Sequence, residues 1–501
     1  MRRGRRKTAP DSAPPKARHL THPFTPQAVF TDDRIAAMHD LALKVLEELG
    51  MKILLAEARD ILRRAGARVE DEMVFIGRDI VAAALATAPD RMVMKAPNPA
   101  WDRAIAPDAL IFTPGGGCPN VFDRVGGRRP GSLASYGDAI RLSQHFSVLH
   151  KLTPAPEPQD VPVHLRHYAM MQTQLGLADK PLTVYGRGRA QVLESFEMIR
   201  LGLGLSDDAF EDGSWASTVV NTNSPRMLDR PMAQALIDFA GANQISIVTP
   251  FCLAGAMAPI TVAGALVLQH AEALACIALT QLVRPGAPVL YGGFGSNVDM
   301  RSGAPAFGTP THLQMQIGSG QLARHIGLPW RSAAGTASNT ADAQGAGETI
   351  MSLWGALMAG ANVVVHAAGW LEGGLTLGFE KLVLDVEALQ ILEAMCAWPD
   401  ASDDALGFAA MAEVAPGGHF FDTTQTMARY REAFADPLVA DLSNHGTWEK
   451  NGSLRADERA TAIWQQALRD FTPPAQGAER VARLARFVAD RSEKGGAPVV
   501  D

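Results

Sequence analysis

The chain has 501 residues, of which 47% are apolar and 20% are charged, a composition typical of a soluble globular enzyme. The formal net charge of −7 argues against nucleic acid or an anionic membrane as the main partner. The four cysteines are scattered with no C-x-x-C spacing, which argues against a disulfide framework and against a structural zinc site.

The first 24 residues differ from the rest of the chain because they are basic, rich in proline and without an apolar run. A secretory signal requires such a run, so the sequence predicts none. We expect residues 1–24 to be a disordered tail, with a transit peptide as the alternative. Without a signal for export, the expected location is the cytoplasm.

Residues 25–108 are predicted to form an α-rich N-terminal extension. Thr31 is placed to cap a first helix, and Gly50 is placed to end it. The apolar residues between them recur with roughly helical period. A second helix is expected near 57–65 and a short strand near 74–76.

From residue 109 the chain repeats one pattern, in which a short apolar run is followed by small or polar residues and then by helical sequence. The spacing of about 30–40 residues fits one βα unit. Eight such units predict an α/β fold, a (β/α)8 TIM barrel over residues 109–395, with a doubly wound open sheet as the alternative. The eight predicted strands are 109–114, 146–152, 181–186, 215–221, 245–250, 288–293, 328–335 and 361–369.

Two further segments complete this picture. The apolar stretch 264–283 is nearly long enough to span a bilayer, but it carries Gln269, His270 and Glu272, so it is predicted to be a buried helix. Residues 396–501 are predicted to form a helical C-terminal segment that packs on the barrel.

Barrel enzymes place their chemistry at the carboxyl ends of the strands, so the site is expected there. Four polar strings follow predicted strands: NTNSPRMLD at 221–229, DMRSG at 299–303, TASNTADAQGAGE at 336–348 and VVVHAAGWLEGG at 363–374. Any one of them could be structural, but four on strand ends favour a site.

Other sites are not supported by the motifs. The glycine-rich strings at 113–118 and 291–296 match neither dinucleotide nor P-loop spacing. No metal is expected, because the histidines at 145, 150, 164 and 167 lack a completing cysteine or carboxylate. There is no G-x-S-x-G elbow for a serine nucleophile.

The chain resembles the trimethylamine methyltransferase family. The similarity runs from about residue 25 to about 472 and includes NTNSPRMLDRPM (221–232), PGAPVLYGGFGSNVDMRSGAPAFGTP (285–310), DAQGAGE (342–348) and GANVVVHAAGWLEGGLTLGFEKLVLDVE (360–387). The resemblance implies transfer of a methyl group from a methylated amine to a corrinoid protein. Since the chain shows no D-x-H-x-x-G motif of cobalamin-binding domains, the corrinoid is expected on a separate partner and not permanently bound here.

One departure from the family narrows the substrate. Archaeal trimethylamine enzymes of the family use pyrrolysine, and this sequence has none. It therefore resembles the bacterial branch without pyrrolysine, which implies a quaternary amine such as glycine betaine. Aromatic faces hold quaternary cations well, and a carboxylate is held by cationic or amide donors.

These requirements select the candidate site residues. We expect substrate contacts from His366, Tyr291, Asn221, Asn223, Trp370, Phe251, Tyr185, Arg331, Glu372 and Asp299. Three residues are expected to face the corrinoid: Gly292, Gly293 and Gln344.

Two other functions stay open at this stage. One is a barrel lyase acting on a small carbonyl compound through a Schiff base, for which Lys151 is the only lysine on a predicted strand. The other is a non-catalytic barrel that binds betaine-like solutes. The sequence leaves the formation of a homo-oligomer open for each of the three functions.

Overall fold

The computed structural model describes residues 18–500, and its centre is one curled eight-stranded sheet. Seven of the strands run parallel, and the eighth, β1 (Leu20–Thr21), joins the edge antiparallel to β7. In spatial order the parallel strands are β7 (Ala109–Phe112), β19 (Val363–Val365), β18 (Trp330–Ala333), β15 (Val289–Gly292), β13 (Ile245–Val248), β11 (Ala216–Val220) and β10 (Leu182–Thr183).

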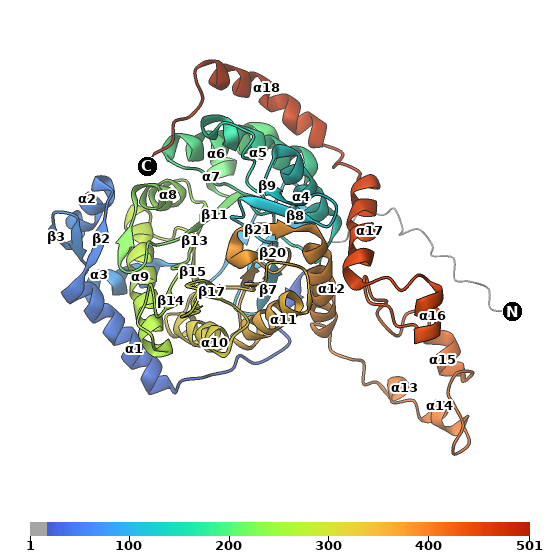
Figure 1. Ribbon diagram of the computed structural model, residues 1–501. Coiled ribbons are helices and arrows are strands. Elements are labelled where there is room, and N and C mark those ends of the chain that lie inside the picture. Colours follow the sequence, from blue (N-terminus) through green and yellow to red (C-terminus); the bar gives the residue numbers. More distant parts are fainter. Residues whose placement is uncertain (1–17, 501) are drawn as a thin grey trace.

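Helices cover the outside of this curled sheet and form a ring around the strands in Figure 1. All residues of β13, β15 and β18 are buried, as expected for parallel strands enclosed on both faces. The helices of the ring are α4 (Leu133–His145), α5 (Val163–Leu177), α6 (Arg189–Leu203), α8 (Arg230–Gly241), α9 (Val262–Val283), α10 (Pro310–His325), α11 (Ala343–Met358) and α12 (Phe379–Met395).

Several of these helices begin where the sequence supplies a capping side chain. The oxygens of Asp229, Thr261, Thr309 and Asp342 each accept a hydrogen bond from the backbone N–H three residues on. Helix α9 has the length and apolarity of a membrane span, but 83% of its most apolar stretch is buried inside the protein. It is a core helix, as its polar residues predicted.

Seven of the eight predicted strands are present, and the second, 146–152, is not a regular strand. It still lies between two strands, because the His150 N–H donates to the Phe112 carbonyl on β7 and the Leu152 N–H donates to the Pro181 carbonyl before β10. The ammonium of Lys180 holds the segment by donating to the carbonyls of Ser143, Phe146 and Leu149.

The N-terminal extension packs on the α9 side of the ring (Figure 1). Its first helix starts after Thr31 and the turns that follow it end at Gly50, as predicted, but the Thr31 hydroxyl donates to Asp33 and does not cap the helix. The elements of the extension are α1 (Asp32–Lys44), a π-helical turn (Val45–Leu49), β2 (Met51–Ile53), α2 (Ala56–Arg64), β3 (Arg68–Glu70), β4 (Met73–Phe75), α3 (Arg78–Thr87), β5 (Met92–Met94) and β6 (Arg103–Ile105).

The predicted tail of residues 1–24 is wrong at its end, because Leu20 and Thr21 pair with β7 and the His22 N–H donates to the Asp108 carbonyl. Residues 1–17 lie outside the described part of the chain. Backbone pairing with the sheet overrides the polar, Pro-rich composition here.

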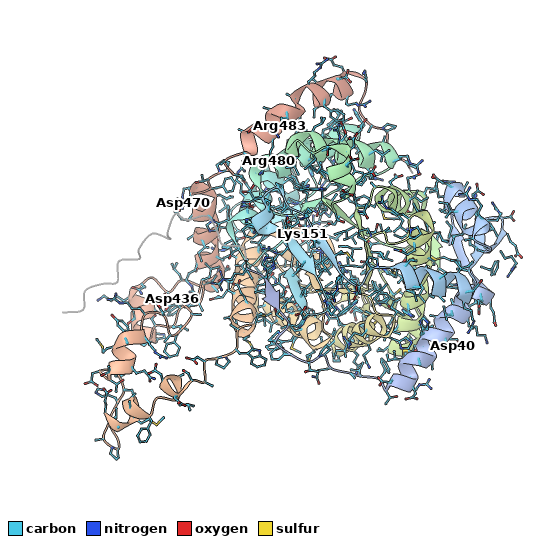
Figure 2. All side chains as sticks on the ribbon, turned by 180° about the vertical axis from the view of Figure 1, so that it is seen from behind. Asp40, Lys151, Asp436, Asp470, Arg480 and Arg483 are labelled. Atoms are coloured by element: carbon cyan, nitrogen blue, oxygen red, sulfur yellow. The ribbon has the colours of Figure 1, made fainter. Side chains whose placement is uncertain are left out.

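Beyond α12 the C-terminal segment divides into two kinds of structure. Helices α17 (Ala456–Arg469) and α18 (Gly477–Glu493) pack on the ring, α17 against α12 and α18 against α5 and α6. Between α12 and α17 lie the short helices α13 (Asp403–Leu406), α14 (Phe408–Ala412), α15 (Thr424–Arg429) and α16 (His445–Lys450), of which α13, α14 and α15 extend away from the body in Figures 1 and 2.

Lys180 offers a test of how the irregular segment is held. The Lys180→Met variant keeps the apolar stem but leaves three buried carbonyls without a donor, so the free energy of unfolding should fall by about 2–4 kcal/mol. Urea titration followed by circular dichroism measures this. The matched control, Lys494→Met on the surface, should change stability by less than about 0.5 kcal/mol. Equal effects of the two substitutions would contradict the assigned role.

Candidate functional site

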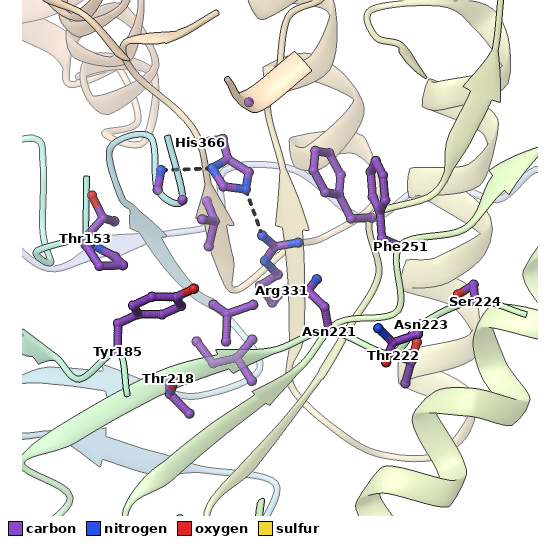
Figure 3. Close-up of a pocket in the computed structure, with 18 of the residues that line it drawn as sticks. Thr153, Tyr185, Thr218, Asn221, Thr222, Asn223, Ser224, Phe251, Arg331 and His366 are labelled. Carbon is purple, nitrogen blue, oxygen red and sulfur yellow. Dashed lines mark hydrogen bonds between the residues drawn. The ribbon is translucent and has the colours of Figure 1, made fainter. Parts of the chain in front are cut away.

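A pocket of about 830 Å³ opens inside the curled sheet at the carboxyl ends of the strands. Its floor reaches down to Ile247 and Val363, and its rim is built by loops that follow the strands. Figure 3 shows side chains from several strands pointing into this space. Its polar and aromatic lining comprises Lys52, Thr113, Lys151, Thr153, Thr183, Tyr185, Thr218, Asn221, Thr222, Asn223, Ser224, Arg226, Phe251, Phe294, Arg331, His366 and Trp370.

Two basic side chains are buried in the pocket. Arg331 on β18 is 1% exposed and Lys151 is 4% exposed. The Lys151 ammonium donates to the Leu152 carbonyl and to the Thr183 hydroxyl, neither of which carries a charge. Among residues 18–500, no Asp or Glu lines the pocket. The pocket therefore carries buried positive charge without a lining counter-ion.

Arg331 keeps donors free for a ligand. Its Nη1 reaches the Gly293 carbonyl at 3.5 Å and its Nη2 reaches His366 Nε2 at 3.3 Å, while its Nε has no hydrogen-bond partner among the described residues. Burial lowers the pKa of Arg331 to about 9, which leaves the guanidinium charged at neutral pH. Burial also lowers the pKa of Lys151, to about 7, with the charge of Arg331 contributing.

His366 follows β19 and stands beside Arg331, as the dashed lines of Figure 3 show. Burial and the charge of Arg331 hold its pKa well below the usual range, so the imidazole is neutral. Its Nδ1 faces the Gly116 N–H at 3.2 Å and its Nε2 faces Arg331. A neutral imidazole accepts only one hydrogen bond, so the ring can accept from only one of these two donors, the Gly116 N–H or the Arg331 guanidinium. The residue has φ +59°, which a non-glycine residue adopts at a cost.

Aromatic rings form one wall of the pocket. The Trp370 ring stacks on the His366 ring at 4.5 Å between centroids, and Phe294 lies 5.5 Å from Trp370 and 5.1 Å from Phe251. Tyr185 follows β10 and is 40% exposed at the rim. Faces of this kind attract a quaternary ammonium group.

The structure brings most of the predicted substrate residues to this pocket. Asn221 and Asn223 line it near the rim, where the Asn221 amide donates to the Thr249 carbonyl and Asn223 is held by Asp229. The predicted residues that line the pocket are His366, Asn221, Asn223, Trp370, Phe251, Tyr185 and Arg331.

Three predicted substrate residues lie elsewhere. Tyr291 points outward from β15, where its hydroxyl meets His270 of α9 at 3.0 Å, because alternate residues of a strand face opposite sides. Glu372 pairs with Arg128, and Asp299 accepts hydrogen bonds from Ser302 in its own turn. None of the three lines the pocket.

The residues expected to face the corrinoid also lie outside the pocket lining. A Cβ on Gly292 would come within 2.4 Å of the Val248 carbonyl, and one on Gly293 within 2.4 Å of the Gln269 amide. These glycines serve close packing. Gln344 is exposed on α11 and donates to Glu348.

Sequence reasoning missed several lining residues, among them Phe294, Thr183 and Thr218. It considered Lys151 only as a Schiff-base lysine, although a lysine within a predicted barrel strand indicates a charged group inside the sheet. Among residues 18–500, no group of three or more His, Cys, Asp or Glu side chains is placed to hold a metal ion.

Comparison with known proteins identifies the family. The sequence pattern of a protein family described as "Trimethylamine methyltransferase (MTTB)" matches residues 1–496 of the chain. The chain belongs to this family. A glycine betaine methyltransferase of Desulfitobacterium hafniense (strain Y51) is 33% identical over 470 residues, which cover 93% of this chain and 98% of that protein. The chain is therefore an enzyme of the methyltransferase class.

Two more distant relatives extend the comparison. A proline betaine:corrinoid methyltransferase of Eubacterium limosum is 25% identical over 498 residues and covers 91% of this chain and 96% of its own length. Among solved structures, the monomethylamine methyltransferase of Methanosarcina barkeri aligns with a TM-score of 0.49 and 9% identity, covering 92% of this chain and 88% of that one.

The lowered pKa of Lys151 predicts a pH dependence of stability. Between pH 7 and pH 10.5 the unfolded chain binds a proton at this lysine that the folded chain lacks, so this group makes stability rise with pH across that window. The Lys151→Met variant should lose the rise, on the order of 1 kcal/mol per pH unit. Urea unfolding at pH 7 and pH 9.5 measures it, with the exposed Lys450→Met as control. Parallel pH profiles of wild type and Lys151→Met would refute the shift.

Proposed function

We propose that the enzyme takes a methyl group from a quaternary amine that carries a carboxylate, of the glycine betaine class, and delivers it to the Co(I) of a corrinoid protein. The names of the relatives support both halves of this proposal, since one acts on glycine betaine and another is a proline betaine:corrinoid methyltransferase. Cytoplasmic location is part of the same proposal.

The observation that carries the substrate class is the charge of the pocket. The charged guanidinium of Arg331 is buried in it beside Lys151, whose pKa is lowered to about 7, and no Asp or Glu of the described residues lines it. A simple cation such as trimethylammonium or choline would add positive charge to a site that already holds it. A zwitterion instead places its carboxylate on Arg331, whose Nε and Nη atoms have donors to spare. The residues proposed to hold the carboxylate are Arg331 and His366, with Lys151 below them.

The aromatic wall suits the other end of such a substrate. Phe251, Phe294 and Trp370 offer apolar and π surface for the methylated nitrogen, each worth about 0.5–2 kcal/mol. With the carboxylate held at depth, the methyl groups face the wider part of the pocket.

The proposed reaction requires little acid–base catalysis from these residues. When the C–N bond breaks, its electron pair stays on nitrogen, and a quaternary ammonium leaves as a neutral tertiary amine that needs no proton. The corrinoid supplies the Co(I) nucleophile when its carrier protein docks. What the pocket residues do is bind the carboxylate, orient one methyl group and exclude water. This division agrees with a lining that contains no acidic side chain and a neutral His366.

Two structural proposals accompany the function. We propose that the curled sheet is a closed barrel in which segment 149–153 takes the place of the missing strand, supported by its backbone hydrogen bonds to β7 and to residue 181. The extension 25–108, the barrel 109–395 and the C-terminal segment 396–501 are proposed as its parts. The lyase alternative loses its support through the family, although Lys151 does line the pocket.

The decisive experiment supplies free cob(I)alamin and a panel of methylated amines and follows loss of the Co(I) absorbance. We expect turnover with carboxylated quaternary amines and at least about tenfold less with choline or trimethylamine. No methyl transfer from any quaternary or tertiary amine would overturn the proposed function. Binding of glycine betaine without transfer would favour the non-catalytic barrel.

A variant of Arg331 tests the carboxylate contact. Arg331→Met removes a charge-assisted hydrogen bond worth about 1.5–3 kcal/mol, so the Kd for a carboxylated amine should rise about 10–100-fold. Choline, which has no carboxylate, should bind the variant at least as well as it binds the wild type. Isothermal titration measures both. Arg301→Met, in an exposed loop outside the pocket, serves as the matched control and should leave both constants unchanged. Equal weakening of the two ligands by Arg331→Met would refute the contact.

A further inference from the structure

Residues 397–437 form an arm that stands away from the ring of helices. In Figures 1 and 2 its helices α13, α14 and α15 lie beyond the α12 side of the molecule, opposite α1. The arm ends where Val439 is buried again and its N–H donates to Glu387 of α12. Both ends of the arm are therefore attached to the protein body, while the middle of the arm is exposed to solvent.

The arm has large apolar side chains but no core of its own. Trp398, Phe408, Phe421 and Phe434 are exposed by 79%, 81%, 80% and 87%. Within the arm only Gly407, Ala410 and Thr423 are buried. Helices of four to six residues are not stable by themselves in water, so the fold of the arm requires a surface that covers these side chains.

We propose that this surface is a second copy of the chain, with the two arms exchanged about a two-fold axis. An aromatic side chain buries about 150–250 Å². Four rings that are about four-fifths exposed offer roughly 600 Å² per arm, and two arms offer roughly 1,200 Å². That figure reaches the range of stable interfaces even before the surfaces that the arms cover are counted.

The body offers apolar surface near the base of the arm. Ile391 and Met395 on α12 are exposed by 58% and 40%. Ile350 and Met351 on the adjoining α11 are each 44% exposed. In a two-fold exchange, the arm of each copy contacts this apolar surface of α11 and α12 on the other copy. Each copy then contributes the same two surfaces, as a two-fold interface requires.

The chemistry of the arm fits a permanent partner better than a transient one. A corrinoid protein must dock and leave in every catalytic cycle, and interfaces of that kind are more polar. The arm instead presents Trp and Phe side chains, as obligate interfaces do. None of its residues lines the pocket that a corrinoid protein must reach.

The test is the mass of the full chain in solution, measured by light scattering after size exclusion. Wild type should have an even multiple of 53.4 kDa. The double variant Phe421→Asp/Phe434→Asp should fall to 53.4 kDa at micromolar concentration, with an unchanged circular dichroism of the body. Leu41→Asp, an equally charged change on exposed α1, should keep the wild-type mass. A monomeric wild type, or a double variant with the wild-type mass, would overturn the proposal.

Hydrogen exchange provides a second readout that does not depend on any variant. In the concentrated wild-type protein the amides of α14 and α15 should exchange at least tenfold more slowly than in the protein diluted to monomer. Fast exchange in the concentrated protein would overturn the proposal. So would protection that appears only when the corrinoid protein is added, since the arm would then belong to that partner.

Discussion

Uncompensated positive charge inside the curled sheet is the constraint on which the site depends. The charge is chiefly that of the buried Arg331, because the pKa of the neighbouring Lys151 is lowered to about 7, and the groups around the two are hydroxyls, carbonyls and a neutral imidazole. Leaving such charges in a low-dielectric interior is costly, and a negative group that enters the pocket recovers part of that cost. Under the proposed function, the pocket would select ligands by their charge near Arg331 and by their apolar shape at its aromatic wall.

The frame explains how these groups are kept in place. Arg331 and the residues before His366 lie on neighbouring parallel strands, with Ala333 paired to Val365, so the guanidinium and the imidazole stay side by side. Lys151 sits on the irregular segment between β7 and β10, which Lys180 fixes from below through three carbonyls. One buried lysine thus orders the segment that carries the other.

The C-terminal segment has two parts with different structural settings. Helices α17 and α18 belong to the ring, where Thr461 and Trp464 of α17 donate to the buried Glu380 of α12. The arm between α12 and α17 contributes nothing to the pocket. Its exposed rings are proposed to bind a second copy, apart from the pocket that is proposed to bind the substrate.

The sequence by itself determined the βα rhythm, because apolar runs of strand length and capped helices are local patterns. Seven of the eight predicted strands follow from such patterns, whereas the one predicted cap, Thr31, does not cap its helix. The same rhythm predicted a site at the strand ends, and the predicted residues His366, Arg331 and Trp370 line the pocket there. The family, too, could be read from the ordered motifs.

Only the tertiary structure decided which side of a strand each residue faces and which charges meet. Tyr291 on β15 faces α9, whereas Arg331 on the neighbouring β18 points into the pocket. The two differ because side chains alternate between the faces of a strand. Gly292 and Gly293 proved to be packing positions because of neighbours far away in sequence. The pairing of Arg331 with Lys151 in one acid-free cavity brings together residues 180 positions apart, and no local pattern encodes that proximity.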